Sequence, residues 1–321
     1  MGTPVKVLVV GSGVSGLSCA ITLAENGFEV LVVTAEDILK TTSAFSGAMW
    51  TPHPVGPAAQ ILRWATQTYR ELASISESDD AGVRMLSGVN AAREPVDDPP
   101  WAARCTPIRR VPAADLPDGY ADGFTFVAPV VDMPRYLTYL RERLAHAGGR
   151  VKRAVLGSLG EVLDAAPIVV NCAGLGAREL VPDATMRGVR GELVVTTNPG
   201  IDRFFAEISE SAEEMLYIYP HASTVVLGGI AVEDEDARHR PEEAEAILKR
   251  CAAVESRLNG AEILGFRTGI RPARPVVRVE AEVVAGTTVI HDYGHGGAGV
   301  SLSWGCARTV RELAELAGQA W

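Results

Sequence analysis

The sequence predicts an α/β fold, with a second, α+β region built on a mixed or antiparallel sheet. Continuous apolar runs typical of buried parallel strands alternate with helical periodicity at both ends of the chain, and segments with strand-like alternation lie between them. Because the α/β segments return after interruptions, we expect two domains, each discontinuous in sequence. We place the first in residues 1–52, 130–186 and 266–321, and the second in residues 53–129 and 187–265.

The N-terminal segment predicts a complete strand, turn, helix and strand unit. Residues 5–10 form an almost continuous apolar run, and a glycine-rich turn follows over residues 11–16. Apolar residues with helical spacing then continue to Asn26, and Gly27 is suited to end the helix. Residues 28–34 predict the next strand.

Residues 52–134 are rich in proline, so we expect an irregular region there with one helix over residues 60–74. The later elements are expected in this order: a helix over 134–146, strands over 151–156 and 168–171, antiparallel strands at ELVVTT, MLYIYP and TVVLGGI, a helix over 242–258, a strand over 287–291 and a last helix over 308–317. The strand over 287–291 leads into the glycine-rich stretch HDYGHGGAG, which is unusual so near the end of a chain.

Composition and charge exclude several classes of function. The 321 residues carry 30 Lys and Arg against 40 Asp and Glu, a formal net charge of -10, whereas nucleic acid binding needs a basic surface. No apolar run reaches the roughly 20 residues that cross a bilayer, so we expect no membrane segment. The five cysteines form no CxxC pair and no Cys/His ligand cluster, so we expect reduced thiols, a cytoplasmic protein and no metal.

The turn GSGVSG matches the G-x-G-x-x-G pattern of Rossmann-type dinucleotide-binding domains. Gly11 permits the tight turn, Gly13 lets the backbone approach a pyrophosphate, and Gly16 lets the helix pack closely on the strand. The N–H groups and dipole at the start of that helix favour phosphate. About 20 residues further on, Glu36 or the adjacent Asp37 is the candidate partner of the ribose hydroxyls, and a solvated acid in a turn is the competing interpretation. This pair of acids would repel an NADP 2′-phosphate.

Four further stretches resemble the D-amino acid oxidase family of FAD flavoproteins. They are TTSAFSGAMWTP at residues 41–52, VVNCAG at 169–174, GIRPARP at 269–275 and HDYGHGGAGVSLSWGCA at 291–307. The resemblance covers nearly the whole chain in the family's order. It implies FAD held without a covalent link, so that both glycine-rich stretches belong to one cofactor site and bring backbone close to the ligand.

The resemblance also implies cofactor contacts residue by residue. It places the pyrophosphate at Gly11, Gly13, Val14, Ser15 and Gly16, phosphate or ribose oxygens at Thr42 and Ser43, and the adenine at Val155. It places the flavin ring along Ala48 and Met49, with its pyrimidine end at Gly296, Gly297, Gly299, Val300 and Ser301, and it counts Arg271 among the residues beside the cofactor.

On the substrate side, the resemblance implies three contacts. Arg271 would clamp a substrate carboxylate through a bidentate pair, the hydroxyl of Tyr217 would meet the same carboxylate, and the carbonyl of Gly297 would accept the amine. An ordinary structural ion pair is the competing interpretation for Arg271, although Arg274 suits that role better. Tyr219 is as visible as Tyr217 in the strand pattern.

The implied activity is FAD-dependent oxidative deamination of neutral or basic D-amino acids by a D-amino-acid oxidase. A hydride would pass from the substrate to flavin N5 without a protein nucleophile or general base. Molecular oxygen would reoxidise the flavin to give hydrogen peroxide, and the imine would hydrolyse to a 2-oxo acid and ammonia. His295 is then interpreted as a hydrogen-bonding strut.

Departures from the family's pattern leave alternatives open. Ala298 and His53 stand where aromatic residues are common, and the short segment 207–216 contains no lid tyrosine. The run LGGIAV contains no arginine after its glycines and the local charge is negative, which argues against acidic D-amino acids. One alternative is a specialised amine or imino-acid oxidase or dehydrogenase that acts on a biosynthetic intermediate, and another is a catalytically inactive flavin-binding protein. The sequence does not fix the preferred substrate, the pathway or the oligomeric state, for which a homodimer is one option.

Overall fold

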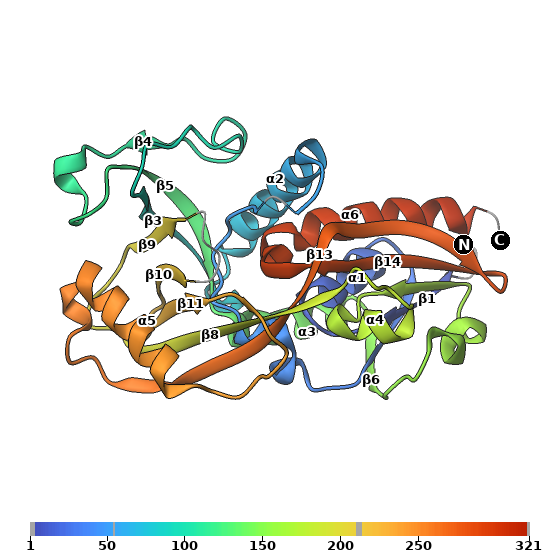
Figure 1. Ribbon diagram of the computed structural model, residues 1–321. Helices are drawn as coiled ribbons and strands as arrows, with labels where there is room; N and C mark the ends of the chain where they lie inside the picture. Colours follow the sequence, from blue (N-terminus) through green and yellow to red (C-terminus); the bar gives the residue numbers. More distant parts are fainter. Residues whose placement is uncertain (1–3, 54, 210–213, 320–321) are drawn as a thin grey trace.

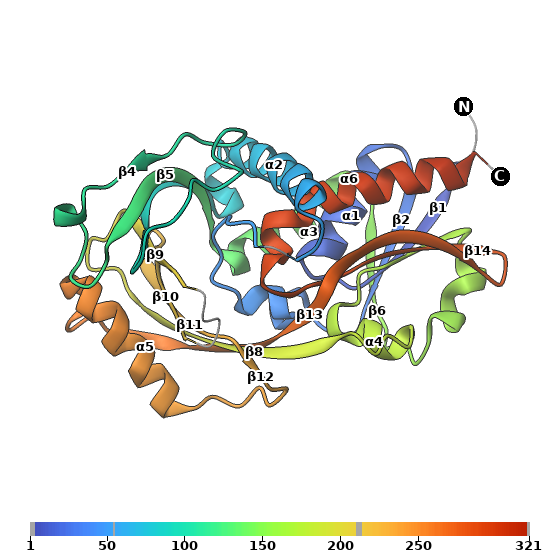
Figure 2. The same ribbon diagram turned by 45° about the horizontal axis from the view of Figure 1, so that its top comes forward.

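A single mixed sheet runs through the molecule in the computed structural model, which describes residues 4–53, 55–209 and 214–319 (Figure 1). The parallel end of this sheet contains β1 (Lys6–Val10), β2 (Glu29–Thr34), β6 (Arg150–Arg153), β7 (Ile168–Asn171) and the C-terminal strand β14 (Thr287–His295). Helices α1 (Val14–Glu25), α3 (Met133–His146) and α6 (Gly299–Gly318) pack on one face of it (Figure 2). Val9, Val32 and Val170 are fully buried, which explains the continuous apolar runs of these strands.

The other end of the sheet is mostly antiparallel. It contains β3 (Val83–Ala92), β4 (Arg109–Arg110), β5 (Asp122–Val131), β8 (Arg187–Thr197), β9 (Phe204–Ile208), β10 (Glu214–Pro220), β11 (Thr224–Ile230) and β12 (Val232–Glu233). Helix α5 (Pro241–Val254) packs on β8, β10 and β11 through a separate apolar cluster that includes Ile247 and Leu227. Helix α2 (Ala58–Ile75) packs on α6, and the short helix α4 (Ala177–Leu180) follows β7.

The 22-residue strand β13 (Ile263–Val284) joins the two ends of the sheet. Its first part pairs with β8 and its second part pairs with β14, both antiparallel. The 14 strands among the described residues therefore form one sheet in the order β4-β5-β3-β9-β10-β11-β8-β13-β14-β7-β1-β2-β6, with β12 paired to β8 beside this path. The predicted fold class, an α/β unit combined with an α+β region, is confirmed.

Two expectations about regular elements were wrong. Residues 52–134 are not an irregular region with one helix, because β3 and β5 pair in antiparallel fashion along their ten-residue lengths. The last helix begins at Gly299 and not at residue 308. Glycine disfavours helices, but Gly305 packs so closely on α2 that an added Cβ would lie 2.3 Å from the Cα of Trp64.

The two long helices carry charged side chains along their length. Helix α2 contains Arg63 and Glu71, and α6 contains Arg308 and Glu312. Within the described ranges, no helix is long and apolar enough to cross a membrane.

Candidate active site

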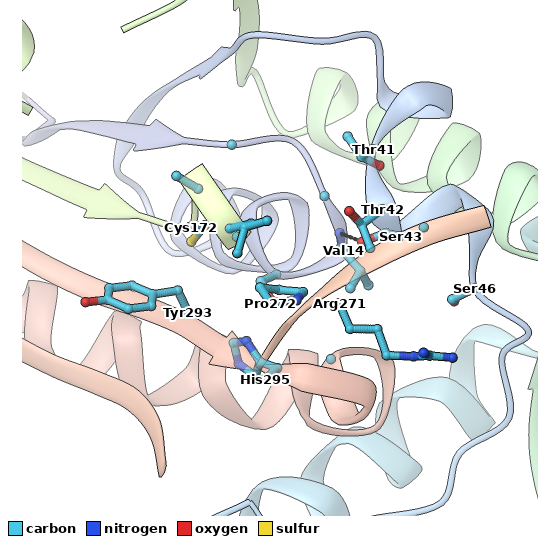
Figure 3. Close-up of a pocket in the computed structure, with 18 of the residues that line it drawn as sticks. Val14, Thr41, Thr42, Ser43, Ser46, Cys172, Arg271, Pro272, Tyr293 and His295 are labelled. Carbon is cyan, nitrogen blue, oxygen red and sulfur yellow. Dashed lines mark hydrogen bonds between the residues drawn. The ribbon is translucent and has the colours of Figure 1, made fainter. Parts of the chain in front are cut away.

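A cavity of about 700 Å³ lies between the carboxyl ends of β1, β2 and β7 and the strands β8, β10 and β13. Its lining combines the N-terminal glycine turn, the segment after β2, the C-terminal glycine-rich stretch and Arg271 (Figure 3). The volume is within the range of small-molecule and cofactor sites. Two glycine-rich stretches from opposite ends of the chain therefore line the same cavity.

The N-terminal turn can be built only with glycine. Gly11 has a φ of 104°, and a Cβ there would lie 2.4 Å from the carbonyl oxygen of Cys172. A Cβ on Gly16 would lie 2.0 Å from the carbonyl oxygen of Gly11, so α1 could not pack as closely on β1. Ser43 accepts a hydrogen bond from the N–H of Val14 at 3.0 Å, which brings the segment after β2 to the start of α1. This cradle of bare backbone and N–H groups fits a dinucleotide pyrophosphate.

The two acids after β2 have different surroundings. The carboxylate of Asp37 accepts a hydrogen bond from the N–H of Leu39 at 2.9 Å and starts a short 3₁₀ turn, whereas Glu36 lines the cavity. This favours Glu36 over Asp37 as the candidate for the ribose hydroxyls. Val155 also lines the cavity and is 78% exposed, so an apolar side chain is free to cover a flat ring there.

The segment expected along the flavin ring is held by β5. Ala48 accepts a hydrogen bond from the N–H of Val131 at 2.9 Å, and Met49 forms a bridge with Val130. Gly296, Gly297, Gly299 and Val300 line the cavity from the other side, and Thr42 and Ser15 are also in the lining. A Cβ on Gly297 would lie 3.9 Å from Cδ of Arg271, so Gly297 and Arg271 are neighbours.

Two of the predicted cofactor residues, Gly16 and Ser301, are not in the lining. Gly16 lies behind the turn, where its lack of a side chain allows α1 to contact Gly11 closely. The hydroxyl of Ser301 accepts from the N–H of Thr51 at 3.0 Å and donates to the carbonyl of Thr51 at 3.0 Å. Ser301 therefore ties α6 to the segment that carries Ala48 and Met49. The other predicted residues are brought together in one cavity.

Arg271 extends from β13 into the pocket (Figure 3). Its Nη1 donates to the carbonyl of Ile230 at 3.0 Å and to that of Arg190 at 3.2 Å, and none of the ion pairs of the described residues involves its guanidinium. Arg274, in contrast, pairs with Asp183 at 2.9 Å, which confirms it as the structural arginine of the run. Arg271 thus retains free N–H groups and an uncompensated charge inside the cavity.

Two tyrosines of β10 line the cavity, and their rings stack with centroids 4.5 Å apart. Burial raises the pKa of Tyr217 to about 12, against the opposing effect of the nearby Arg271 charge, so its hydroxyl stays protonated and can donate. Burial also raises the pKa of Tyr219, and there the second influence is Tyr217. The charge of Arg271 therefore acts on Tyr217 in particular. A Cβ on Gly228 would lie 1.8 Å from Cζ of Tyr217, so glycine makes room for the ring.

The neutral part of the lining includes residues that the sequence prediction missed. Leu193, Met215 and Phe45 line the cavity together with His53. The alternation of strands held a signal, because Met215 precedes Tyr217 by two positions and so shares its face. Loss of hydration and the charge of Arg271 lower the pKa of His53, so its imidazole, although open to the cavity, is neutral near pH 7. Residues 210–213 of the short segment 207–216, where we expect no lid tyrosine, lie outside the described residues.

The five cysteines are free thiols, but three of them lie around one buried carboxylate, which corrects the expectation of no cluster with histidine. Cys19 donates to Asp292 at 3.2 Å and Cys172 is 3.8 Å from the same oxygen, while Cys306 and His295 approach the carboxylate as well. Burial raises the pKa of the Cys19 and Cys172 thiols, so they stay protonated and act as donors. Cys19 and Cys172 therefore both contact the same oxygen of the Asp292 carboxylate. His295 Nε2 lies 3.2 Å from Oδ1 of Asp292 but makes no hydrogen bond with it, so the role of His295 as a hydrogen-bonding strut stays a prediction.

Comparison with known proteins agrees with this geometry. Residues 6–313 match the model of the DAO family, described as FAD dependent oxidoreductase. The chain is 43% identical over 318 residues to a D-amino-acid oxidase from Rubrobacter xylanophilus, covering 98% of this chain and 96% of that protein. It is 42% identical over 316 residues to a D-amino-acid oxidase from Streptomyces coelicolor, covering 96% of both.

A solved structure, glycine oxidase from Geobacillus kaustophilus, aligns with a TM-score of 0.80 and 17% identity over 97% of this chain and 94% of that one. At this identity the alignment shows a shared fold. The family match extends over nearly the whole chain and includes both glycine-rich stretches of the cavity. The protein therefore belongs to the DAO family of FAD-dependent oxidoreductases.

Proposed function

We propose that the protein is a D-amino-acid oxidase that converts neutral or basic D-amino acids, oxygen and water to 2-oxo acids, ammonia and hydrogen peroxide. The observation that carries this proposal is the position of Arg271, whose guanidinium has no carboxylate partner among the described residues and faces the cavity that the dinucleotide-binding glycines line. A protein that bound FAD alone would have no use for an unpaired arginine there. The D-amino-acid oxidases to which the chain is 42% and 43% identical support the same activity.

The residues of the cavity suit three tasks in this reaction. Arg271 binds the substrate carboxylate in a bidentate manner, and the protonated hydroxyl of Tyr217 donates to the same group. The carbonyl of Gly297, beside Arg271, accepts the substrate amine and so turns the α-hydrogen toward the ring. FAD, when bound, supplies the two-electron acceptor for the hydride and is reoxidised by oxygen.

Further residues would hold the cofactor in this proposal. The glycine turn and the first turn of α1 would hold the pyrophosphate, Glu36 the ribose, and Val155 the adenine. The Ala48–Met49 segment and the C-terminal glycines would hold the ring. We also propose that residues 1–52, 130–186 and 266–321 form the FAD-binding domain, and that residues 53–129 and 187–265 form the substrate-binding domain. The cavity, lined by both sets, supports this division.

Two finer points belong to the same proposal. The five free thiols support a reducing compartment such as the cytoplasm. A homodimer remains a hypothesis, which light scattering on the purified holoenzyme tests directly.

Product analysis tests the activity. The purified yellow protein is incubated in air with matched D- and L-amino acids, and peroxide, ammonia and 2-oxo acid are quantified. We expect equal amounts of the three products from neutral D-amino acids and none from their L-enantiomers. Turnover of imino acids or other amines in place of D-amino acids would favour the specialised oxidase, and a protein that binds FAD but gives no product with any of them would overturn the proposal.

A further inference from the structure

Behind Arg271, strand β8 carries two fully buried charged residues, Arg190 and Glu192, each 0% exposed. Nη2 of Arg190 contacts the Glu192 carboxylate and donates to the carbonyl of Arg238 at 2.9 Å. Nη1 of Arg190 donates to Glu243 at the start of α5, at 2.5 Å. The arginine is thus bound by two carboxylates and one carbonyl.

The Glu192 carboxylate also fastens the segment that precedes α5. One of its oxygens meets Nδ1 of His239, and the other, which Arg190 contacts, accepts a hydrogen bond from the N–H of Arg240 at 3.3 Å. The His239 ring stacks on Phe266 with centroids 4.0 Å apart. Residues 238–243 are therefore held against β8 by one continuous set of polar contacts, which we call the β8 network (Arg190, Glu192, His239 and Glu243).

A buried network of this kind is weak evidence for stability, because desolvation of the charges offsets most of their attraction. Its position indicates a different role. Side chains alternate along a strand, so Arg190 and Glu192 project to one side of β8 and Gly191 faces the other. A Cβ on Gly191 would lie 2.3 Å from Nη1 of Arg271, so the Arg271 guanidinium rests directly on this glycine.

One hydrogen bond of Arg271 ends on β8, the strand that carries Arg190 and Glu192, and the other ends on the neighbouring strand β11. Its Nη1 donates to the carbonyl of Arg190 itself and to that of Ile230 at the end of β11. The next strand, β12, pairs with β8 with Val232 opposite Arg190. A shift of the Arg190–Gly191 peptide would therefore move both the support of the guanidinium and one of its two acceptors.

We propose that Arg190 and Glu192 are positioning residues for the carboxylate clamp: they fix the peptide on which Arg271 rests, so that its free N–H groups face the cavity in a bidentate orientation. The inference rests on the proposed role of Arg271 in substrate binding. Arg271 uses one terminal nitrogen for the two carbonyls and keeps the other donors for a ligand. The network thus acts on substrate affinity and not on the cofactor.

The substitution Glu192→Gln tests the proposal, because it keeps the shape and removes the charge that holds Arg190 and His239. We expect KM for neutral D-amino acids to rise roughly 3- to 30-fold, with kcat, FAD content and the visible spectrum unchanged. The matched control is Glu312→Gln, which removes the surface partner of Arg63 between α6 and α2, away from β8; its KM should equal that of the wild type.

A binding measurement separates this outcome from failure of the proposed reaction. Anaerobic titration with acetate, followed through the flavin absorbance, needs no turnover, and Glu192→Gln should weaken acetate binding by the same factor as it raises KM. Unchanged acetate affinity in a variant with a wild-type melting temperature would overturn the positioning role. An inactive wild type that still binds acetate would instead remove the proposed reaction.

A milder pair of variants covers the case in which Glu192→Gln does not fold. The side chain of His239 is 34% exposed, so changes there are better tolerated. His239→Asn keeps a nitrogen donor near the position of Nδ1 and should retain wild-type KM, whereas His239→Leu should raise it. Equal KM values for both variants and the wild type would contradict the inference.

Discussion

Arg271 and Tyr217 are distinguished by what surrounds them. Arg274 lies three positions from Arg271 and is neutralised by Asp183, whereas the Arg271 guanidinium meets two carbonyl oxygens. The Arg271 charge opposes the rise in the pKa of Tyr217, whereas burial and Tyr217 are what raise the pKa of Tyr219. A carboxylate that enters the cavity would therefore meet one cation and one neutral donor together.

Tyr217→Phe removes that donor and keeps the ring. Because a hydrogen bond to a charged group contributes about 1.5–3 kcal/mol, we expect KM to rise roughly 10- to 100-fold with a smaller fall in kcat. With a pKa of about 12, Tyr217 should also cause no change in KM between pH 6.5 and 9 in the wild type. Tyr219→Phe is the matched control, and a larger effect at Tyr219 would exchange their roles.

At the residue scale the run GIRPARP could identify the arginine, but the strand pattern alone could not choose between Tyr217 and Tyr219, and the choice of Tyr217 came from the family resemblance. The run GIRPARP marks both arginines, and the competing ion pair of Arg274 follows from its contact with Asp183. Tyr217 and Tyr219 share one face of β10, so alternation cannot separate them. The choice between Glu36 and Asp37 also depended on a local hydrogen bond, that of Asp37 with Leu39.

At the scale of elements, close backbone contacts explain where the glycines lie. Gly16 packs α1 on the turn after β1, Gly305 packs α6 on α2, and Gly191 supports Arg271. In each case an added Cβ would fall within 2.3 Å of another atom. These helices and strands therefore keep their positions only while the glycines lack side chains.

Gly16→Ala should separate α1 from the glycine turn, because the new Cβ would lie 2.0 Å from the Gly11 carbonyl. Overpacking of this kind costs about 1–3 kcal/mol, so we expect the FAD dissociation constant to rise roughly 10- to 100-fold, measured by flavin fluorescence on reconstitution of the apoprotein. Gly265→Ala is the control, since nothing lies within 4 Å of its Cβ position. Wild-type FAD affinity in Gly16→Ala would show that close packing at this turn is unnecessary.

Strands buried on both faces were predicted well from the sequence. Elements whose formation depends on packing against another strand or helix were not. The runs at β1, β2 and β7 are apolar throughout, so local sequence is sufficient. The sequence of β3, VRMLSGVNAA, shows little alternation of apolar and polar residues, and its central Gly88 packs against Phe204 of β9. The start of α6 is rich in glycine, and only its packing on α2 makes the helix favourable there.

At the scale of the whole molecule, β13 explains how strand β8 and the C-terminal glycines come to line one cavity. Its first part pairs with β8, where Gly191 lies, and its second part pairs with β14, which leads into the C-terminal glycines. The fold class followed from the order of segments. The length of β13 did not, because GIRPARP contains two prolines, which are rare within strands.

The buried histidines make stability depend on pH. Burial lowers the pKa of His221 and His291, which in the unfolded chain titrate near about 6.5. Between the lowered values and about 6.5 the unfolded chain binds more protons than the folded one, so the free energy of unfolding falls as the pH drops through this window. We expect a lower melting temperature for the holoenzyme at pH 5.5 than at pH 7.5.

The variant His221→Gln should show a smaller difference between the two pH values. Carboxylates such as Asp183, whose pKa is lowered, lose their stabilising effect only below about pH 4, outside this window. A melting temperature that is equal or higher at pH 5.5 would contradict the assignment to histidines.

The role of Arg271 in binding the substrate carboxylate is tested most directly by anaerobic reduction of the bound flavin with a neutral D-amino acid. The measurement compares the wild type with Arg271→Lys and Arg271→Ala. Truncating one partner of a buried charge pair costs about 2–5 kcal/mol, so Arg271→Ala should need at least roughly 30 times more substrate for half-maximal bleaching, with wild-type FAD content. Arg271→Lys keeps the charge without the bidentate geometry of the guanidinium. Its substrate concentration for half-maximal bleaching should lie between those of the wild type and Arg271→Ala. Bleaching of Arg271→Ala at wild-type substrate concentrations would contradict the claim that Arg271 clamps the substrate carboxylate.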